Sequence, residues 1–397
     1  MKIKWNFGIF SEVGKPDSFR YLILLVAFSF CFNCGYSQKI HNFKAPNVLI
    51  ESRANVGFLI AHHLEMEVFN KHIPSFEISL AKATYGKQQW EALYLYPVMG
   101  VTYWSGHLGS EETLGKAHAI MPYISFPLTK NRNNELDLKV SAGLGYLTQK
   151  FDRLENYKYI AIGSHVNAAV NFMVEYRWKP TSFLQLSAGM QLMHFSNGSI
   201  KTPNFGLNIP SLSAGVAFRL NKENPYIMRS FRPSLTMYEF DGHDFLEGRV
   251  SFSFGTKSIG EVISERYNVM TGSISVLKSL SYKSKAGLCF DILYDGSDVR
   301  FIDEEGEKTE TGSILAKTGV SLMYELVVSR LSFPFGLGFY TGGRSNEGIS
   351  YYKIGMQYLV TPNVFGAITL KTHFARADYV TFGVGYRFKM KYNLKKL

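Results

Sequence analysis

A histidine and a serine two residues apart are the side chains in this sequence most suited to catalysis. His194 and Ser196 stand in the run His-Phe-Ser-Asn-Gly at 194–198, and a histidine can act as the base that activates a serine nucleophile. On a strand, residues two apart point to the same face. The preceding residues alternate as a strand does, and the pair continues an apolar face made of Leu184, Leu186, Ala188, Met190 and Leu192. A reactive pair on an apolar face fits an enzyme whose substrate is a lipid.

Three asparagines complete the candidate site. Asn208 begins the strand that follows the 197–207 loop, on the face that continues with Pro210, Leu212, Ala214, Val216 and Phe218. If the two strands pair around the loop, Asn208 lies beside His194 and can orient its ring. Asn197 and Asn204 can offer amide donors to an oxyanion. The alternative is that the histidine and the serine are ordinary polar residues at the rim of a barrel.

The rest of the sequence indicates an all-β protein that could carry such a site. The 397 residues include 24 Tyr, 31 Phe and 35 Gly, spread over many short alternating segments, and no apolar run of about 18 residues follows the N-terminus. The clearest segment, 168–178, places Ala168, Val170, Phe172, Val174, Tyr176 and Trp178 on one face. An apolar outer face that ends in aromatic residues is typical of a membrane barrel. A large soluble β-sandwich or propeller is the alternative.

The lengths of the connections favour an outer-membrane antiparallel β-barrel of about sixteen strands. Such barrels have short periplasmic turns and longer outer loops, and the sequence alternates between the two kinds if 221–245 is a periplasmic excursion. Two of the strands are expected over 90–104 and 160–178. The excursion divides the chain into two eight-stranded halves, which could be tandem barrels or one wide barrel.

The N-terminus predicts export to the outer membrane of a bacterial cell. Basic residues precede an apolar core over 21–32, and Gly35-Tyr36-Ser37 offers small residues for cleavage before Gln38. A lipoprotein modification of Cys34 is the alternative. The expected divisions are a signal peptide at 1–37, a first barrel half at 38–221, a periplasmic linker at 222–245 and a second, non-catalytic half at 246–397.

Neither a metal site nor a disulfide is expected. Cys289 is the only cysteine left after cleavage, so no disulfide framework can form. His243, Asp244 and Glu247 resemble metal ligands but have no second cluster to complete a site, and we interpret them as solvated linker residues. We therefore expect no cofactor.

The net charge of the chain raises the question of which anionic partners it binds. The formal net charge is +11, yet no basic helix or zinc-ligand spacing predicts nucleic-acid binding. Anionic lipid head groups of the outer membrane are the expected partners. The oligomeric state is left open.

The stretch around the candidate site resembles the lipid A 3-O-deacylase family of outer-membrane enzymes. The matching residues are His-Phe-Ser-Asn-Gly at 194–198 and Pro-Asn-Phe-Gly-Leu-Asn at 203–208. The resemblance covers about 46–221 and implies an eight-stranded barrel that removes an ester-linked acyl chain from the lipid A of lipopolysaccharide without a metal. It implies Ser196 as the nucleophile, His194 as the base, and Asn197 and Asn204 as oxyanion-hole candidates. The family's catalytic triad has an acidic third residue, and Asn208 stands in its place, which is a departure from the family pattern.

The second half repeats part of this pattern without its chemistry. His373-Phe374 matches His194-Phe195, but Ala375 stands where a serine would be needed. We expect His373 to be a lumen or rim residue. The leading hypothesis for the whole chain is thus a serine-type ester hydrolase acting on lipopolysaccharide, and the alternative is a non-catalytic barrel, porin-like or structural.

Overall fold

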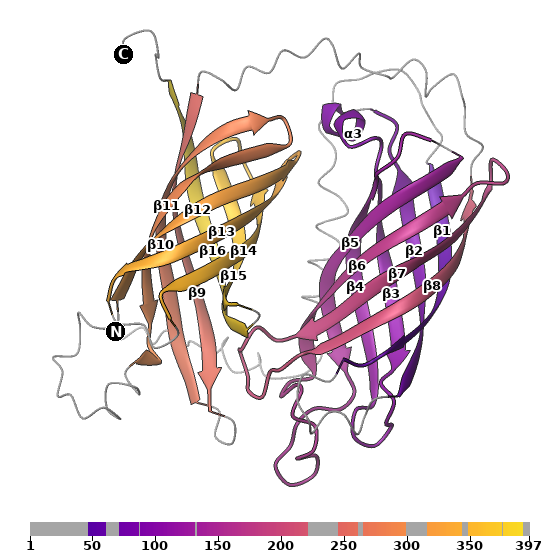
Figure 1. Ribbon diagram of the computed structural model, residues 1–397, viewed down its shortest axis with the longest axis horizontal. Helices are drawn as coiled ribbons and strands as arrows, with labels where there is room; N and C mark the ends of the chain where they lie inside the picture. The colour runs from indigo at the N-terminus through magenta and orange to yellow at the C-terminus, as the bar shows by residue number, and fades with distance from the viewer. Residues whose placement is uncertain are drawn as a thin grey trace, which may run out of the picture. The chain divides into compact units, whose positions relative to one another are not determined.

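The computed structural model shows two closed antiparallel β-barrels of eight strands each, β1–β8 and β9–β16 (Figure 1). The structure describes residues 47–60, 71–86, 88–131, 133–220, 245–260, 265–298, 316–343, 348–374 and 376–391. Within these residues, no helix is long and apolar enough to cross a membrane. The predicted signal peptide and most of the predicted linker lie outside the described residues.

The first barrel closes because its first strand pairs with its last. Its strands are β1 (Val48–Phe58), β2 (His72–Ala83), β3 (Val98–His107), β4 (Lys116–Pro127), β5 (Asn134–Leu147), β6 (Val166–Trp178), β7 (Leu184–Ser196) and β8 (Leu207–Arg219). Ala54 of β1 lies opposite both Phe76 of β2 and Ala214 of β8. This double pairing leaves the sheet without an edge, so the first half is a complete barrel.

The second barrel closes in the same way, between β9 and β16. Its strands are β9 (Phe245–Ile259), β10 (Glu265–Ser281), β11 (Ser284–Asp295), β12 (Ala316–Val328), β13 (Leu331–Gly342), β14 (Ser350–Leu359), β15 (Val364–His373) and β16 (Arg376–Lys391). Phe254 pairs with both Met270 of β10 and Phe382 of β16. Of the two arrangements that the sequence left open, tandem barrels are therefore the one adopted, and the predicted count of sixteen strands is confirmed.

Two of the predicted strands begin in the wrong place. The expected strand over 90–104 is a short helix α3 (Gln89–Leu93), a turn, and then β3 from Val98. Gln, Glu, Ala and Leu are good helix formers, so local preference overrides the strand reading there. The expected strand over 160–178 begins only at Val166, and the residues before it belong to a long loop at 148–165.

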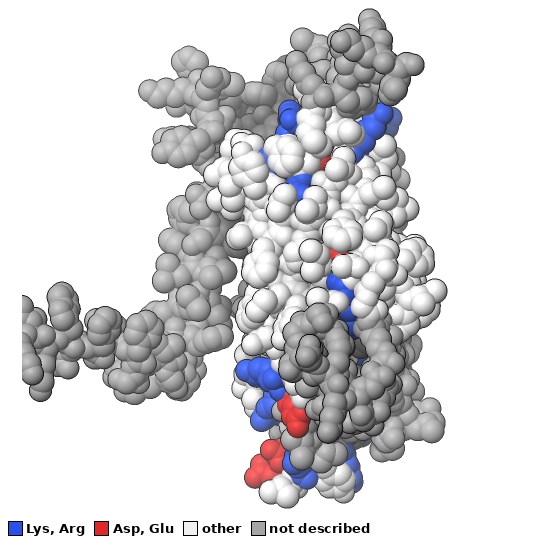
Figure 2. Space-filling view, turned by 90° about the vertical axis from the view of Figure 1, so that its left-hand side faces the viewer, with Lys and Arg blue, Asp and Glu red and all other residues white. Residues whose placement is uncertain are grey.

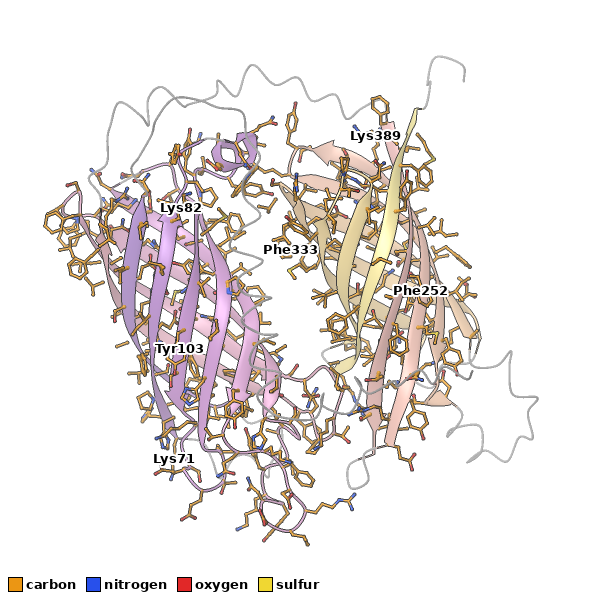
Figure 3. All side chains as sticks on the ribbon, turned by 180° about the vertical axis from the view of Figure 1, so that it is seen from behind. Lys71, Lys82, Tyr103, Phe252, Phe333 and Lys389 are labelled. Carbon is orange, nitrogen blue, oxygen red and sulfur yellow. The ribbon has the colours of Figure 1, made fainter. Side chains whose placement is uncertain are left out.

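The outer walls are apolar, as the alternation predicted. On β6, the residues from Ala168 to Trp178 alternate between exposed or half-buried apolar side chains and buried ones such as Asn171, Glu175 and Arg177. The second barrel presents the same kind of wall, on which Phe252 is labelled in Figure 3. In Figure 2, which faces that barrel, uncharged side chains cover most of the middle and Lys and Arg gather toward the ends. Side chains of this kind can face lipid in the middle and water at both ends.

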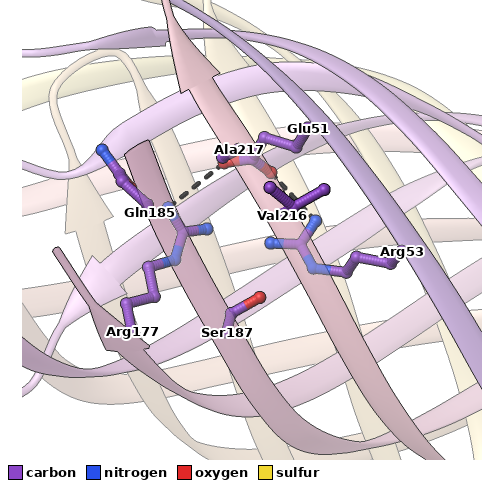
Figure 4. Close-up of a pocket in the computed structure, with 7 residues that line it drawn as sticks. All are labelled: Glu51, Arg53, Arg177, Gln185, Ser187, Val216 and Ala217. Carbon is purple, nitrogen blue, oxygen red and sulfur yellow. Dashed lines mark hydrogen bonds and ion pairs between the residues drawn. The ribbon is translucent and has the colours of Figure 1, made fainter. Parts of the chain in front are cut away.

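The inside of the first barrel is filled in two zones. One zone is an ion cluster formed by Glu51, Arg53, Glu77, Asp137, Lys139, Glu175 and Arg177, all almost fully buried. Arg53 contacts Glu51 and Glu175, each at 2.9 Å, and Arg177 is 2.6 Å from Glu175. Figure 4 shows Arg53 and Arg177 converging on Glu51. Opposite charges are paired within the cluster, as buried charges require.

The second zone is an apolar cluster at the end of the barrel that carries the long loops at 108–115, 148–165 and 197–206. This end is called the long-loop end below. The cluster is built mainly from Leu59, Ile73, Trp104, Leu108, Leu114, Met121, Leu147, Tyr159, Ile162, Met193, Phe195, Leu207 and Ile209. It anchors the ends of β7 and β8 and the inner side of the 148–165 loop. The apolar cluster thus supports, from inside the barrel, the side chains on the outer wall at the ends of β7 and β8.

Candidate active site

The hairpin of β7 and β8 brings His194 and Asn208 together. The two residues are direct cross-strand partners, as predicted, and His194 Nδ1 lies 2.7 Å from Asn208 Oδ1. An amide oxygen only accepts hydrogen bonds, so Nδ1 carries the proton and donates it. In the neutral ring the lone pair is then on Nε2, the nitrogen that can act as a base. The asparagine fixes both the tautomer and the orientation of the histidine.

Ser196 lies beside the same histidine on the outer wall. It is the last residue of β7 and is half-buried, as is His194, whereas the intervening Phe195 is fully buried in the apolar cluster. Gly206 of the following loop passes against both outward side chains. A Cβ atom added to Gly206 would lie 3.0 Å from His194 Cε1 and 3.7 Å from Ser196 Cβ. The backbone of the loop therefore forms one side of the site, at a distance that only glycine allows.

The 148–165 loop supports the loop that carries the asparagines. Gly206 N–H donates to Ala161 O at 3.0 Å and Gly163 N–H to Pro203 O at 2.7 Å. Ile162 and Asn204 form an isolated antiparallel bridge. These backbone bonds fasten the 197–206 loop over the end of the barrel. Its position is thereby fixed by a segment distant in sequence from the hairpin.

The two predicted oxyanion donors have different surroundings. The buried Asn197 side chain donates from Nδ2 to Ser164 Oγ and to Lys201 O, both at 2.8 Å, and its backbone N–H donates to Asn204 Oδ1 at 2.9 Å. All of these donors of Asn197 are therefore engaged within the loops. Asn204 is half-buried, and its Nδ2 has no hydrogen-bond partner among the described residues. Because its Oδ1 is held by Asn197, Asn204 presents a fixed donor.

Asp152 and Tyr159 of the 148–165 loop are each held in place by their surroundings. The backbone N–H groups of Leu154 and Glu155 donate to the Asp152 carboxylate and hold its pKa below the usual range. Burial raises the pKa of Tyr159, so its phenol stays protonated in the apolar cluster. Neither group is placed to replace Asn208 beside His194, since Asp152 is bound to its own turn and Tyr159 faces the interior.

The second barrel carries no equivalent arrangement in its described residues. His373 is a rim residue facing inward, as predicted: Nδ1 lies 3.0 Å from Ser350 O, and Nε2 lies 3.0 Å from Lys371 Nζ. Ala375 lies outside the described residues. Cys289 is buried and is a free cysteine.

One part of the metal interpretation is wrong. Glu247, expected to be a solvated linker residue, lies on β9 inside the second barrel and pairs with Arg249 and with Lys285, the latter at 2.9 Å. His243 and Asp244 lie outside the described residues. Among the residues that are described, no group of three or more His, Cys, Asp or Glu side chains could hold a metal ion.

Sequence reasoning missed the contribution of the 148–165 loop, including Ser164. Ser164 accepts a hydrogen bond from Asn197 and donates one to Asn167 Oδ1 at 2.9 Å, which links the loop to β6. The Gly163-Ser164 pair was a turn signal that could have ended the strand expected over 160–178. Nothing in the spacing of these residues pointed to the candidate site.

Two family models match the chain, one for each barrel. Residues 75–217 match the lipid A 3-O-deacylase family. Residues 246–390 match a family described as the C-terminal domain of acyloxyacyl hydrolase. The chain belongs to the lipid A 3-O-deacylase family. As a member of that family it is a protein of the bacterial outer membrane, which agrees with the apolar outer walls of both barrels.

The solved structures that resemble this chain do so only distantly. Neisserial surface protein A has 12% identity, covers 44% of this chain and 97% of its own, and gives a TM-score of 0.32. The outer-membrane enzyme PagL has 15% identity, covers 42% and 97%, and gives 0.29. A Rhodopseudomonas blastica porin variant has 8% identity over 86% of this chain and 99% of its own, with a TM-score of 0.18. No curated protein matches the sequence.

Proposed function

We propose that the protein is a serine-type ester hydrolase of the outer membrane that removes an ester-linked acyl chain from lipid A. The observation that carries this proposal is the 2.7 Å contact between His194 Nδ1 and Asn208 Oδ1, on the same outward face as Ser196. A histidine with a fixed tautomer beside a serine is the arrangement that nucleophilic acyl transfer requires. The outward face gives it access to a lipid rather than to a solute in the barrel interior.

The proposed reaction proceeds in two steps. Ser196 Oγ attacks the ester carbonyl of the acyl chain while His194 Nε2 takes the serine proton. The oxyanion accepts a hydrogen bond from Asn204 Nδ2, and collapse of the intermediate expels the sugar alkoxide, which receives the proton from His194. Water then attacks the acyl-serine with His194 again as the base, and the fatty acid leaves. Asn197 is a positioning residue in this scheme, because it holds Asn204 by the oxygen of its amide.

Asn208 distinguishes this site from a catalytic triad whose third residue is acidic. An amide orients the histidine by a neutral hydrogen bond but does not stabilise the imidazolium by charge. The imidazolium that forms as Ser196 attacks is therefore less stabilised than it would be beside a carboxylate. We propose a lower turnover than a carboxylate would support, with the same order of steps.

The two halves have different roles in this proposal. The first, 38–221, is the catalytic barrel, following export directed by 1–37, and 222–245 links it to the second. The second, 246–397, is non-catalytic, because its histidine at 373 is engaged with Lys371 inside the barrel.

The replacement Ser196→Ala tests the proposal directly. We expect a strain that overproduces the parent protein to lose one acyl chain from lipid A in mass spectra and to release the fatty acid. The Ser196→Ala strain should keep its lipid A intact, while the purified variant keeps the heat-dependent gel migration of a folded barrel. Intact lipid A in the parent strain would instead favour a non-catalytic barrel.

A further inference from the structure

A row of alternating tyrosines and histidines crosses the outer wall of the first barrel at its long-loop end. Its members, called the Tyr–His arc, are Tyr103 of β3, His118 of β4, Tyr146 of β5 and His165 just before β6. Tyr103 Oη lies 2.8 Å from His118 Nδ1 and the two rings stack. His118 and Tyr146 are direct cross-strand partners. Tyr146 stacks on His165, with ring centroids 5.7 Å apart. The four side chains are therefore continuous.

The arc lies at the border between apolar wall and polar loops. Tyr103 is 37% and Tyr146 49% exposed, and the neighbouring outward residues Ile120 and Leu144 are exposed and apolar. Figure 3 labels Tyr103 on this wall. Tyrosine and histidine side chains combine an apolar body with a polar tip and so suit the level of the lipid head groups.

Polar atoms of the arc remain available for a ligand. His165 Nδ1 donates to Leu147 O at 2.8 Å, so the ring is fixed and Nε2 has no hydrogen-bond partner among the described residues. Tyr146 Oη likewise has none there. At the other end, His118 Nδ1 is shared by Tyr103 Oη and by Ser105 Oγ at 3.2 Å. Tyr146 and His165 are thus the members best placed to bind a head group.

The charges around the arc favour an anionic ligand. Lys116 lies two residues before His118 on the same outward face, with its side chain 50% exposed, and its carboxylate neighbour Glu111 is 3.8 Å away and 77% exposed. The arc itself contains no carboxylate. Lys150 and Lys201 act electrostatically on Asp152 in the adjoining loops, so further cations lie at the same end. Phosphate is the anionic group that such donors and lysines recognise in a lipid head.

The arc also leads to the candidate active site. His165 is followed directly by β6, and Ala168 of β6 pairs with Ser196. Neighbouring strands are about 4.8 Å apart, so the Tyr146–His165 end lies within the width of a sugar head group of Ser196. Resting on the proposed function, we propose that the Tyr–His arc binds the phosphorylated sugar head of the lipid whose ester reaches Ser196. The enzyme then selects phosphorylated lipid A over its dephosphorylated form.

Steady-state kinetics of the full chain in detergent test this inference. The two substrates are phosphorylated lipid A and the same lipid A after enzymatic removal of its phosphates. His165→Phe and Tyr146→Phe should each raise KM for the phosphorylated lipid about tenfold, since a hydrogen bond to a charged group is lost. Their kcat values, and their KM values for the dephosphorylated lipid, should stay at the parent level.

Matched controls separate the arc from general effects on the wall. Tyr176 is also 49% exposed but lies at the other end of β6, and His72 is an exposed histidine at the start of β2 outside the arc. Tyr176→Phe and His72→Phe should leave both KM values unchanged. Tyr146→Phe keeps the ring and its packing, so it remains informative if His165→Phe fails to fold. Equal losses on both lipids, or no change with either arc variant, would overturn the inference.

A binding measurement keeps this inference distinct from the proposed function. Retention of phosphorylated lipid A by the Ser196→Ala protein can be followed by native mass spectrometry, which needs no turnover. Added to this background, His165→Phe and Tyr146→Phe should reduce retention of the phosphorylated lipid and His72→Phe should not. If the parent hydrolyses neither lipid but this pattern holds, the binding role of the Tyr–His arc is supported and the hydrolase proposal is refuted. Unchanged retention in both arc variants would refute the arc.

Discussion

His194 and Asn208 face each other across the β7–β8 hairpin, with Nδ1 and Oδ1 2.7 Å apart. The contact joins the end of β7 to the start of β8, immediately beside the loop that carries Asn197 and Asn204. It sets which nitrogen of the histidine can receive a proton. The role proposed for Ser196 depends on that nitrogen being Nε2.

Two replacements of Asn208, by alanine and by glutamate, should have different effects on turnover. Asn208→Ala removes a hydrogen bond worth about 1 kcal/mol, so we expect kcat to fall about fivefold. Asn208→Glu should keep or raise kcat, because a carboxylate stabilises the imidazolium that forms as Ser196 attacks. KM should change little in both variants, since the interaction strengthens only as charge develops. If both variants turn over lipid A like the parent while Ser196→Ala is inactive, another group orients the histidine.

Asn204 and Asn197 should differ in what their loss affects. Asn204→Ala removes the donor proposed for the oxyanion and should lower kcat about 100-fold with little change in thermal stability. Asn197→Ala breaks buried hydrogen bonds to Ser164 and Lys201 and should lower the unfolding temperature as well as kcat. Kinetics and thermal unfolding of both variants provide the comparison. An Asn204→Ala enzyme with full turnover would show that the oxyanion is stabilised elsewhere.

Gly206→Ala should impair the site by direct contact. Gly206 has a φ of 80°, which costs a residue with a side chain about 1 kcal/mol. The new Cβ would also lie 3.0 Å from His194 Cε1, so the ring or the loop must shift. We expect a clear loss of kcat in a folded protein. Gly366→Ala, whose Cβ would meet nothing within 4 Å, is the control and should behave like the parent in the same assay.

The ion cluster inside the first barrel should dominate its stability. Arg53→Met leaves Glu51 and Glu175 buried with one cation fewer, which should cost about 3–5 kcal/mol of unfolding free energy. Lys179→Met breaks a 2.7 Å pair with Glu135 whose side chains are 20% and 15% exposed, and should cost about 1 kcal/mol or less. Urea unfolding in lipid vesicles, followed by gel migration, measures both. Equal midpoints for the two variants would contradict the assigned role of the cluster.

The sequence by itself determined the faces of the strands and the pairing at the site. Side chains alternate with a period of two along a strand, so the outward direction of Ser196 and His194 and the inward direction of Glu175 follow from local order alone. The partnership of His194 with Asn208 was also predicted, because both residues lie on the outward faces of the two segments that flank the 197–206 loop. His373 was placed at the rim of the second barrel by the same argument from its neighbours on β15.

Only the tertiary structure decided how the barrels close and what supports the site. Alternation says nothing about which distant strand pairs with β1, so the contact of Ala54 with Ala214 that makes two barrels rather than one could not be read from the sequence. The engagement of Asn197 with Ser164 joins two loops that are more than thirty residues apart. Such loop contacts follow no period and are set by the packing of the apolar cluster beneath them, which exists only once the barrel has closed.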